Sequence, residues 1–209
     1  MEELSMSRDE ALAAGLLIIG ARSRVASSVR IVPREDNGAD YGPVTIGEDC
    51  IIRENVVLST GTTFGNKVLV GHQSVFRRNI KVGSNTTFAH IVSIQRDIVI
   101  GERCRVSALT HLAGGSVLED HVQIGAGVVT VDDNTLTWPT TKLEASVYRR
   151  GCRIGSGCTV LGGLEIGQNT LVGAGSLVTR SLPPDVVAYG SPAYVQRDRS
   201  PEEIAQSSA

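Results

Sequence analysis

The chain of 209 residues has few aromatic side chains, since three Phe, four Tyr and one Trp make up only 4% of it. A core without large rings has to be built from aliphatic side chains in thin, regular layers, and hydrophobic residues, at 41%, are numerous enough for one. Acidic and basic residues are nearly balanced, with 22 Asp and Glu against 20 Lys and Arg. The sequence therefore has no basic excess of the kind that favours nucleic acid or an anionic membrane surface as a partner.

Long hydrophobic runs are also absent. The longest is Leu16–Ile19, between two glycines, which is far short of the roughly 20 residues that a membrane-spanning helix needs. The N-terminal sequence MEELS is acidic, whereas a secretory signal begins with positive charge. We therefore expect a soluble cytoplasmic protein and, from its length, a single domain over residues 1–209.

Glycine, in contrast, is abundant, with 23 residues, and the chain repeats with a period of six. Large apolar residues recur at every sixth position from Ile46 to Ile124, Thr130 interrupts them, and the same phase returns from Tyr148 to Val178. Neither an α-helix, with a period of about 3.6, nor a simple β-strand, with a period of two, produces this spacing. A unit of one short strand and one corner does, and hexapeptide repeats of this kind are typical of a parallel β-helix.

Two other positions of the repeat have their own composition. The position four residues after each large apolar residue holds small or β-branched side chains, so we expect it to point inward too. The position three residues after it is mostly Gly, Asn or Asp, which tolerate a positive φ, so we expect the corner there. Three such units per coil predict about seven coils, over residues 25–130 and 148–182. Residues 1–24 would form an N-terminal cap and residues 183–209 a C-terminal tail.

Both ends carry signals for a short helix, and two segments leave the repeat. Ser7 and Glu10 have the spacing of a capping box, and residues 200–203, SPEE, are a similar helix start. Residues 33–43 are polar and predict a surface loop. Residues 131–147 also leave the repeat, although the phase is kept across them, and we expect an extruded active-site loop there, because an insertion into a regular solenoid is a common place for function.

The phase of the repeat also sorts the cysteines and histidines. All four cysteines fall at the inward position, which excludes a disulfide or metal site and predicts inert core residues. His72 and His90 are 18 residues apart and should stack at one corner, but no third histidine in register completes a zinc site, so we expect no metal. His121 falls at the corner position, where a structural role is expected. His111 faces outward near the start of the 131–147 loop, either as a catalytic or substrate-orienting residue or as an interface residue.

The extruded loop supplies the remaining candidates. Asp132 and Asp133 open it, and adjacent carboxylates at a corner are either solvated turn residues or functional groups. Trp138 lies within the loop and offers a flat surface for stacking on a base or a sugar. We therefore take His111, Asp132 and Asp133 as candidate catalytic residues and Trp138 as a candidate substrate-binding residue.

The end of the repeat carries the most specific similarity. The stretch from Ile154 to Arg197, IGSGCTVLGGLEIGQNTLVGAGSLVTRSLPPDVVAYGSPAYVQR, resembles the acyl-CoA-binding coils, the Pro-Pro exit and the closing segment of the hexapeptide-repeat acyltransferases. The resemblance extends over nearly all of residues 25–197. It implies an all-β fold, a left-handed parallel β-helix. It also implies acetyl-CoA as the acyl donor, no metal, and a homotrimer with active sites between neighbouring subunits.

The same resemblance implies roles for four residues. Ser156 and Ala174 match positions whose backbone N–H groups contact the pantetheine arm of CoA. Arg180 stands where the family has a Lys near the CoA phosphates, and Arg197 matches the Arg that ends the closing segment. Tyr194 is a departure, because the closing segment usually has Lys there.

The segments VLEDHVQIGAGVVTVDDN and YRRGCRIGSGCTVLGG are most similar to the N-acetyltransferases of nucleotide-linked amino sugars, which have an Asn-Asp pair in place of Asp132 and Asp133. Sugar and xenobiotic O-acetyltransferases instead carry a histidine inside the loop, and residues 131–147 contain none. A neutral amine also needs less help from a base than a hydroxyl, which must lose its proton as it attacks. We therefore predict acetyl-CoA-dependent N-acetylation of a nucleotide-linked amino sugar, with Asp133 holding the amine.

Three alternatives stay open. The first is an O-acyltransferase acting on a sugar or a small natural product, with His111 as the base. The second is a non-catalytic β-helix that serves as an assembly scaffold, which would have no need of CoA-type residues such as Ser156 and Arg180. The third is a carbonic-anhydrase-like trimer, for which the histidine spacings do not supply three zinc ligands.

Overall fold

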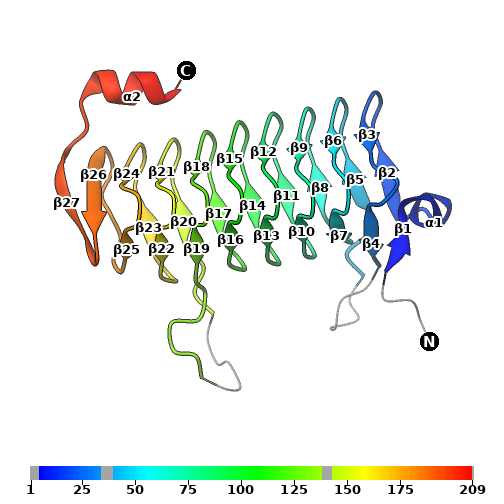
Figure 1. The fold of residues 1–209 in the computed structure, drawn as a ribbon, viewed down its shortest axis with the longest axis horizontal. Helices are drawn as coiled ribbons and strands as arrows, with labels where there is room; N and C mark the ends of the chain where they lie inside the picture. The colour runs from blue at the N-terminus through cyan, green and yellow to red at the C-terminus, as the bar shows by residue number, and fades with distance from the viewer. Residues whose placement is uncertain (1–4, 34–39, 138–142, 209) are drawn as a thin grey trace.

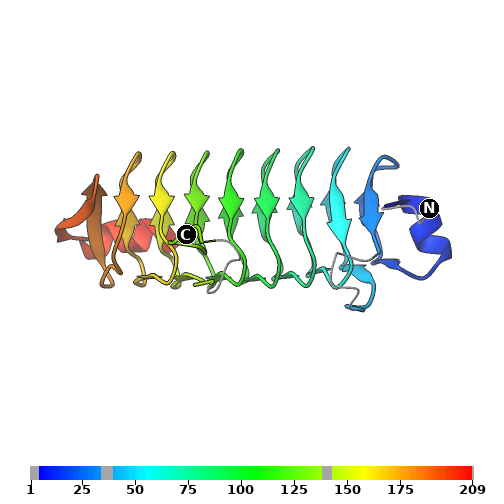
Figure 2. The ribbon, with the colours of Figure 1, turned by 90° about the horizontal axis from the view of Figure 1, so that it is seen from below.

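A computed structural model describes residues 5–33, 40–137 and 143–208. The chain winds into a left-handed parallel β-helix, a prism whose three faces are parallel sheets (Figure 1). Each coil contributes one strand to sheet B, then one to sheet C, then one to sheet A, and the coils stack evenly from α1 (Arg8–Ala13) to the C-terminal hairpin (Figure 2). Below, the A/B corner is the turn from sheet A into sheet B, and the C/A corner is the turn from sheet C into sheet A.

The strands are short, as the repeat predicts. Sheet A consists of β1 (Met6–Ser7), β4 (Arg30–Val32), β7 (Val57–Ser59), β10 (Val75–Phe76), β13 (Ser93–Ile94), β16 (His111–Leu112), β19 (Val129–Thr130), β22 (Thr159–Val160) and β25 (Leu177–Val178). Sheet B consists of β2 (Leu17–Ile19), β5 (Val44–Ile46), β8 (Thr63–Phe64), β11 (Lys81–Val82), β14 (Val99–Ile100), β17 (Val117–Leu118), β20 (Val147–Tyr148) and β23 (Glu165–Ile166). Sheet C consists of β3 (Arg24–Val25), β6 (Ile51–Ile52), β9 (Leu69–Val70), β12 (Thr87–Phe88), β15 (Arg105–Val106), β18 (Gln123–Ile124), β21 (Arg153–Ile154), β24 (Leu171–Val172), β26 (Val186–Gly190) and β27 (Ala193–Asp198).

The columns of the repeat take the predicted positions. The large apolar column, from Ile46 to Val178, is buried along its whole length, and the small or β-branched column is buried with it, apart from a partly buried Leu164. The corner column has positive φ from Asp49 to Gly127 and from Gly151 to Gly175, even at residues such as Lys67, Ile91 and Leu109. A left-handed conformation at bulky residues is unfavourable, so the coil geometry imposes it there against local preference.

The coil count differs from the sequence-based expectation. Sheet B has eight strands, so the prism has eight coils rather than about seven. The additional coil begins with β2, whose Leu17, Ile18 and Ile19 pair in parallel with Val44–Ile46 of β5. This strand lies inside the segment predicted as the N-terminal cap, residues 1–24. The repeat could not show it, because the loop after β4 breaks the six-residue phase between the first coil and the second.

The two ends are closed differently. At the N-terminus the predicted capping box is present, since Ser7 Oγ accepts from the Glu10 backbone N–H and the Glu10 carboxylate accepts from Ser7 N–H. At the C-terminus the segment predicted as a tail contains a hairpin, in which β26 continues sheet C beside β24 and β27 returns antiparallel to it. The predicted C-terminal helix follows as α2 (Pro201–Ser208). None of the helices that the structure describes is long and apolar enough to cross a membrane.

Both loops that leave the repeat do so at the A/B corner. The first follows β4 and the second follows β19, and Figure 1 shows both on the same side of the prism. The loop at 131–147 therefore emerges beside the outer face of sheet A, where β16 carries His111.

Candidate functional site

His111 lies on the outer face of sheet A, because its neighbour Leu112 points into the core. In the ladder it stacks between Ser93 of β13 and Val129 of β19. Its Nδ1 lies 3.3 Å from the Ser93 hydroxyl oxygen, and the ring is partly buried. Burial lowers the pKa of His111 below its ordinary value, while the negative charge of Asp132 acts in the opposite direction. The lowered pKa favours the neutral imidazole, whose Nδ1 lies beside the Ser93 hydroxyl.

Thr130, the one polar residue of the large apolar column, supports the strand that carries His111. In regular coils the residue after each strand donates its N–H to a carbonyl in the next coil, as Gln95 does to Leu112. At Ala113 the loop has already carried the next coil away, and the Thr130 side-chain oxygen accepts this N–H instead, at 2.7 Å. The same hydroxyl lies 3.4 Å from the His111 carbonyl oxygen. Thr130 therefore replaces the missing backbone acceptor where the loop departs, and it stabilises the strand that carries His111.

The two loop carboxylates have different surroundings. Asp132 Oδ2 accepts from the Gly114 N–H at 3.1 Å, and the Asp132 charge acts on His111. Asp133 Oδ1 instead accepts from Thr135 N, Thr135 Oγ1 and Leu136 N, at 2.8 to 2.9 Å. These three contacts build the turn that starts the loop. The structure thus places the Asp132 carboxylate on the Gly114 backbone, near enough for its charge to act on His111, and places this oxygen of Asp133 in the loop's own turn.

Asn134, which the sequence did not single out, anchors the loop to the coil above it. Its Oδ1 accepts from Gly162 N at 2.9 Å and its Nδ2 donates to Gly162 O at 3.0 Å, so the side-chain amide pairs with the backbone as a strand would. The same Nδ2 reaches Glu144 Oε2 at 3.3 Å, where the chain returns from the loop. A sequence signal existed, since an Asn follows the acidic pair, but its partner lies 28 residues away. Trp138, the candidate substrate-binding residue, lies outside the described residues.

Ser156 and Ala174 occupy equivalent places at the C/A corner of successive coils, and each is followed by a glycine with positive φ. A Cβ added to Gly157 or Gly175 would meet nothing within 4 Å, so this edge of the prism is open. Among the described residues none accepts the backbone N–H of Ser156 or of Ala174. Two backbone N–H groups without an acceptor among the described residues therefore lie at an edge of the prism that has no bulky side chains.

The two predicted cofactor-binding arginines, Arg180 and Arg197, lie near the C-terminal hairpin. The Arg180 guanidinium carbon sits 4.6 Å from the centre of the Tyr194 ring, in a cation–π contact. Tyr194, which replaces the expected Lys, thus positions Arg180 rather than adding a charge. Arg197 forms a two-point ion pair with Glu203 of α2, at 2.7 and 2.8 Å. Arg197 therefore holds the C-terminal helix against β27 in this structure.

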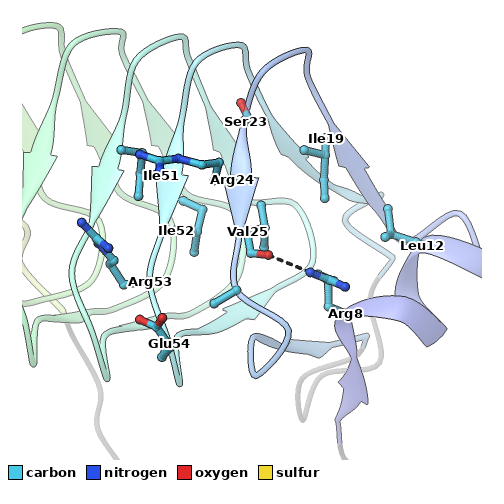
Figure 3. Close-up of a pocket in the computed structure, with 11 residues that line it drawn as sticks. Arg8, Leu12, Ile19, Ser23, Arg24, Val25, Ile51, Ile52, Arg53 and Glu54 are labelled. Carbon is cyan, nitrogen blue, oxygen red and sulfur yellow. Dashed lines mark hydrogen bonds between the residues drawn. The ribbon is translucent and has the colours of Figure 1, made fainter.

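Two surface hollows lie on sheet C. One, of 240 Å³, includes Ser156 and is lined by Arg105, Gln123 and Arg153. The other, of 480 Å³, lies at the N-terminal end beneath α1 (Figure 3). There Arg8 donates to the Val25 carbonyl oxygen, and Arg24 extends past Ile51 on the surface of the sheet. None of the predicted site residues lines this second hollow.

No group of three or more His, Cys, Asp or Glu side chains among the described residues is arranged to hold a metal ion. His72 Nδ1 lies 2.9 Å from Glu54 Oε2, in an exposed pair at the C/A corner. The four cysteines are buried and free, as their phase predicts.

Comparison with known proteins gives a consistent picture. No family model matches the chain. It is 39% identical over 85 residues to a galactoside O-acetyltransferase from Lactococcus lactis, a match that covers 37% of this chain and 41% of the relative. It is 33% identical over 94 residues to a serine acetyltransferase from Buchnera aphidicola, covering 39% of this chain and 36% of the relative. The chain thus spans about two fifths of the length of these curated relatives.

Among solved structures, the chain is similar to LpxA from Bacteroides fragilis, described as a UDP-N-acetylglucosamine acyltransferase. The TM-score is 0.69 at 14% sequence identity, and the superposition covers 87% of this chain and 70% of the other. At this level of identity the likeness shows the fold. It agrees with the β-helix found here from Leu17 to Val178.

Proposed function

Because the chain is similar to hexapeptide-repeat acyltransferases, we propose that it transfers an acetyl group from acetyl-CoA to a small-molecule acceptor, with His111 as the proton acceptor. The observation that carries this proposal is the surroundings of His111. The ring is partly buried, its pKa is lowered by that burial, and the charge of Asp132 acts on it. A base that is neutral at working pH, with a carboxylate nearby to stabilise its protonated form, is what general base catalysis requires.

The C/A corner fits the pantetheine arm of CoA. The N–H groups of Ser156 and Ala174 have no acceptor among the described residues, and the glycines beside them leave the edge open. Bound there, acetyl-CoA would supply the acetyl group as a thioester. Arg180, fixed against Tyr194, supplies a positive charge for the phosphates at the C-terminal end of the same prism.

In this proposal Nε2 of His111 takes the proton of the acceptor as the acceptor attacks. Asp132 stabilises the positive charge that then develops on the ring. The same nitrogen returns the proton to the departing sulfur, so the histidine ends the cycle neutral. Thr130, which binds the backbone on either side of Leu112, keeps the ring's strand in place through both transfers.

A hydroxyl is the acceptor that this geometry supports best. A hydroxyl must lose its proton during attack, and His111 is the neutral base that this needs. The predicted amine acceptor, on a nucleotide-linked amino sugar, is the second candidate. The carboxylates where the loop joins the coil favour an amine acceptor. Asp132, Asp133 and Glu144 gather negative charge where an ammonium group would enter. Asp133, however, uses one oxygen in the loop turn.

We also propose that the chain acts as a homotrimer with active sites between subunits. The apolar side chains that support this face outward without cover from their own chain: Val75 and Val129 on sheet A, Val99 on sheet B, and Ile91 and Leu109 at the C/A corner. Exposed apolar side chains on a regular outer surface are typical of a contact surface. Sedimentation that gives a species of three chains would support this, and an active monomer would contradict it.

The experiment that tests the function follows thiol release from acetyl-CoA with two acceptors that differ only in the accepting group, methyl α-D-glucoside and methyl α-D-glucosaminide. We expect acceptor-dependent release of CoA and a loss of it in His111→Ala. His121→Ala is the matched control, because His121 lies at a corner on the surface. No binding of acetyl-CoA by calorimetry, with no release for either acceptor, would contradict the proposal and favour a scaffold.

A further inference from the structure

We propose that Ser93 is a positioning residue for the acetyl transfer, and that it decides which nitrogen of His111 acts as the base. Its hydroxyl accepts a hydrogen bond from Nδ1–H of His111, so that Nε2 keeps the free lone pair. This inference rests on the proposed function, because it concerns the histidine that takes the proton of the acceptor. It adds a residue that neither the repeat nor the family resemblance singled out.

The place of Ser93 in the ladder carries the first step. Ser93 of β13 pairs with His111 of β16 in the parallel ladder of sheet A, and its other neighbour in that ladder is Val75 of β10. His111 in turn has Val129 on its far side. Both flanking side chains are valines, which offer no hydrogen-bonding group. The serine hydroxyl and the imidazole are therefore the two polar groups of this stretch of the outer face.

The contact itself carries the second step. Ser93 Oγ lies 3.3 Å from Nδ1 of His111, and both side chains are partly buried. Neither side chain has another hydrogen-bond partner among the described residues. A polar group in a partly buried place is costly to leave without a partner, so each of the two depends on the other. The hydroxyl thus holds one edge of the ring and leaves the Nε2 edge open to a substrate.

The direction of this hydrogen bond carries the third step. A neutral imidazole has one N–H donor and one acceptor nitrogen, whereas a hydroxyl can donate or accept. If the hydroxyl donated to Nδ1, the ring proton would sit on Nε2, and no free lone pair would remain for the acceptor. If Nδ1–H donates to the hydroxyl, Nε2 can take the proton, and the Ser93 contact persists in the charged ring, whose hydrogen bonds are stronger. The second arrangement stabilises the state that develops during attack, which is what raises kcat.

Ser93 and the loop contribute in different ways. A hydroxyl is neutral at working pH, so it fixes the ring without the charge that would raise the pKa of His111 strongly. The charge comes from Asp132, and burial outweighs its effect and keeps the pKa of His111 lowered. Neither ladder neighbour of His111, Ser93 or Val129, has a side chain that titrates near neutral pH. The histidine is thus oriented by one residue and stabilised in its charged form by another.

The test uses Ser93→Ala, which removes the hydroxyl, and Ser93→Thr, which keeps it on a side chain that suits a β-strand. With the better of the two acceptors of the functional assay, Ser93→Ala should lower kcat/KM roughly tenfold, the effect of losing a hydrogen bond to a group that becomes charged. The KM for acetyl-CoA should stay unchanged, and Ser93→Thr should retain most of the wild-type kcat/KM. Thr87→Val is the matched control and should leave kcat/KM unchanged, because Thr87 is likewise a partly buried, outward-facing strand residue but lies on sheet C.

A second readout does not depend on turnover. Nitrogen NMR shifts of the imidazole distinguish a ring nitrogen that carries a proton from one that does not, and the His111 signal is the one missing from the spectrum of His111→Gln. At a pH above the midpoint of the titration, without acceptor, we expect the proton on Nδ1 in the wild type and on either nitrogen in Ser93→Ala.

A proton on Nε2 in the wild type would overturn the role of Ser93, as would a Ser93→Ala protein with unchanged shifts and unchanged kcat/KM. Both outcomes leave the transfer of acetyl from acetyl-CoA untouched. Failure of the wild type to bind acetyl-CoA would instead overturn the proposed function.

Discussion

The pH dependence of acetyl transfer is the most direct test of the pairing between His111 and Asp132. Burial lowers the pKa of His111 below its ordinary value of 6.5, and Asp132 raises it without compensating fully. The neutral ring is the active form in our proposal, so kcat/KM should rise with pH through a midpoint below 6.5 and reach a plateau above it. Replacing the carboxylate in Asp132→Asn removes the negative charge that favours the protonated ring. The midpoint should therefore move to still lower pH.

The size of the effect on kcat/KM follows from the ladder. One step between coils, about 4.8 Å, and three residues along the chain, about 3.3 Å each, place the backbones of His111 and Asp132 about 11 Å apart. At that separation and with an effective dielectric constant of about 20 to 40, the attraction between a charged ring and the carboxylate is about 0.8–1.5 kcal/mol. On the plateau the loss of this attraction should lower kcat/KM by up to roughly tenfold, because the ring becomes charged as the acceptor attacks. His111→Gln removes the base itself and should cost about 10²–10⁴-fold.

The assay is thiol release from acetyl-CoA between pH 5 and pH 8, with the wild type, Asp132→Asn, Asp133→Asn and His111→Gln. A midpoint at or above 6.5 in the wild type, or an upward movement in Asp132→Asn, would refute the assignment of His111 as a buried neutral base. Asp133→Asn separates the two acceptors. For a hydroxyl acceptor it should have a mild effect, since Asn keeps an oxygen for the loop turn. For an amine acceptor it should cost one to three decades, roughly the range for charge partners, while the histidine variant costs only about tenfold.

Three further outcomes are expected. Thiol reagents should not label the folded protein, because the four cysteines are buried and burial raises the pKa of Cys104, for example, to about 11; rapid labelling without denaturant would contradict this. Arg180→Ala should raise the KM for acetyl-CoA roughly tenfold to a hundredfold with kcat nearly unchanged, and steady-state kinetics with a fixed acceptor would show otherwise if Arg180 lies away from the phosphates. Phe76→Ala should lower the free energy of unfolding, measured by chemical denaturation, by about 3–5 kcal/mol. Phe76 makes edge-to-face contacts with Phe64 and Phe88, at centroid distances of 5.3 and 4.9 Å. A loss below about 1 kcal/mol would show that the core repacks around the gap.

Much of the fold could be predicted from the spacing of residues alone. The inward columns, the corner column and the capping box at Ser7 follow from local rules, since each depends on which residue type tolerates burial, a positive φ or a free N–H. The same rules identified His111 as an outward-facing histidine, because its position in the six-residue unit sets the side on which its ring lies. They did not reveal β2 or the hairpin of β26 and β27, which lie where the repeat is interrupted.

The sequence by itself determined the prism, because side-chain burial and corner geometry repeat every six residues and each unit specifies its own orientation. Only the tertiary structure decided which polar groups share a site. The separation of the two acidic neighbours, with the charge of Asp132 acting on His111 and Asp133 in the loop turn, depends on how the loop folds back on the coil. Likewise Asn134 reaches Gly162 and Ser93 reaches His111 only because stacked coils place residues 18 or 28 positions apart in contact. Such contacts arise from the register between coils, which no spacing within one repeat unit contains.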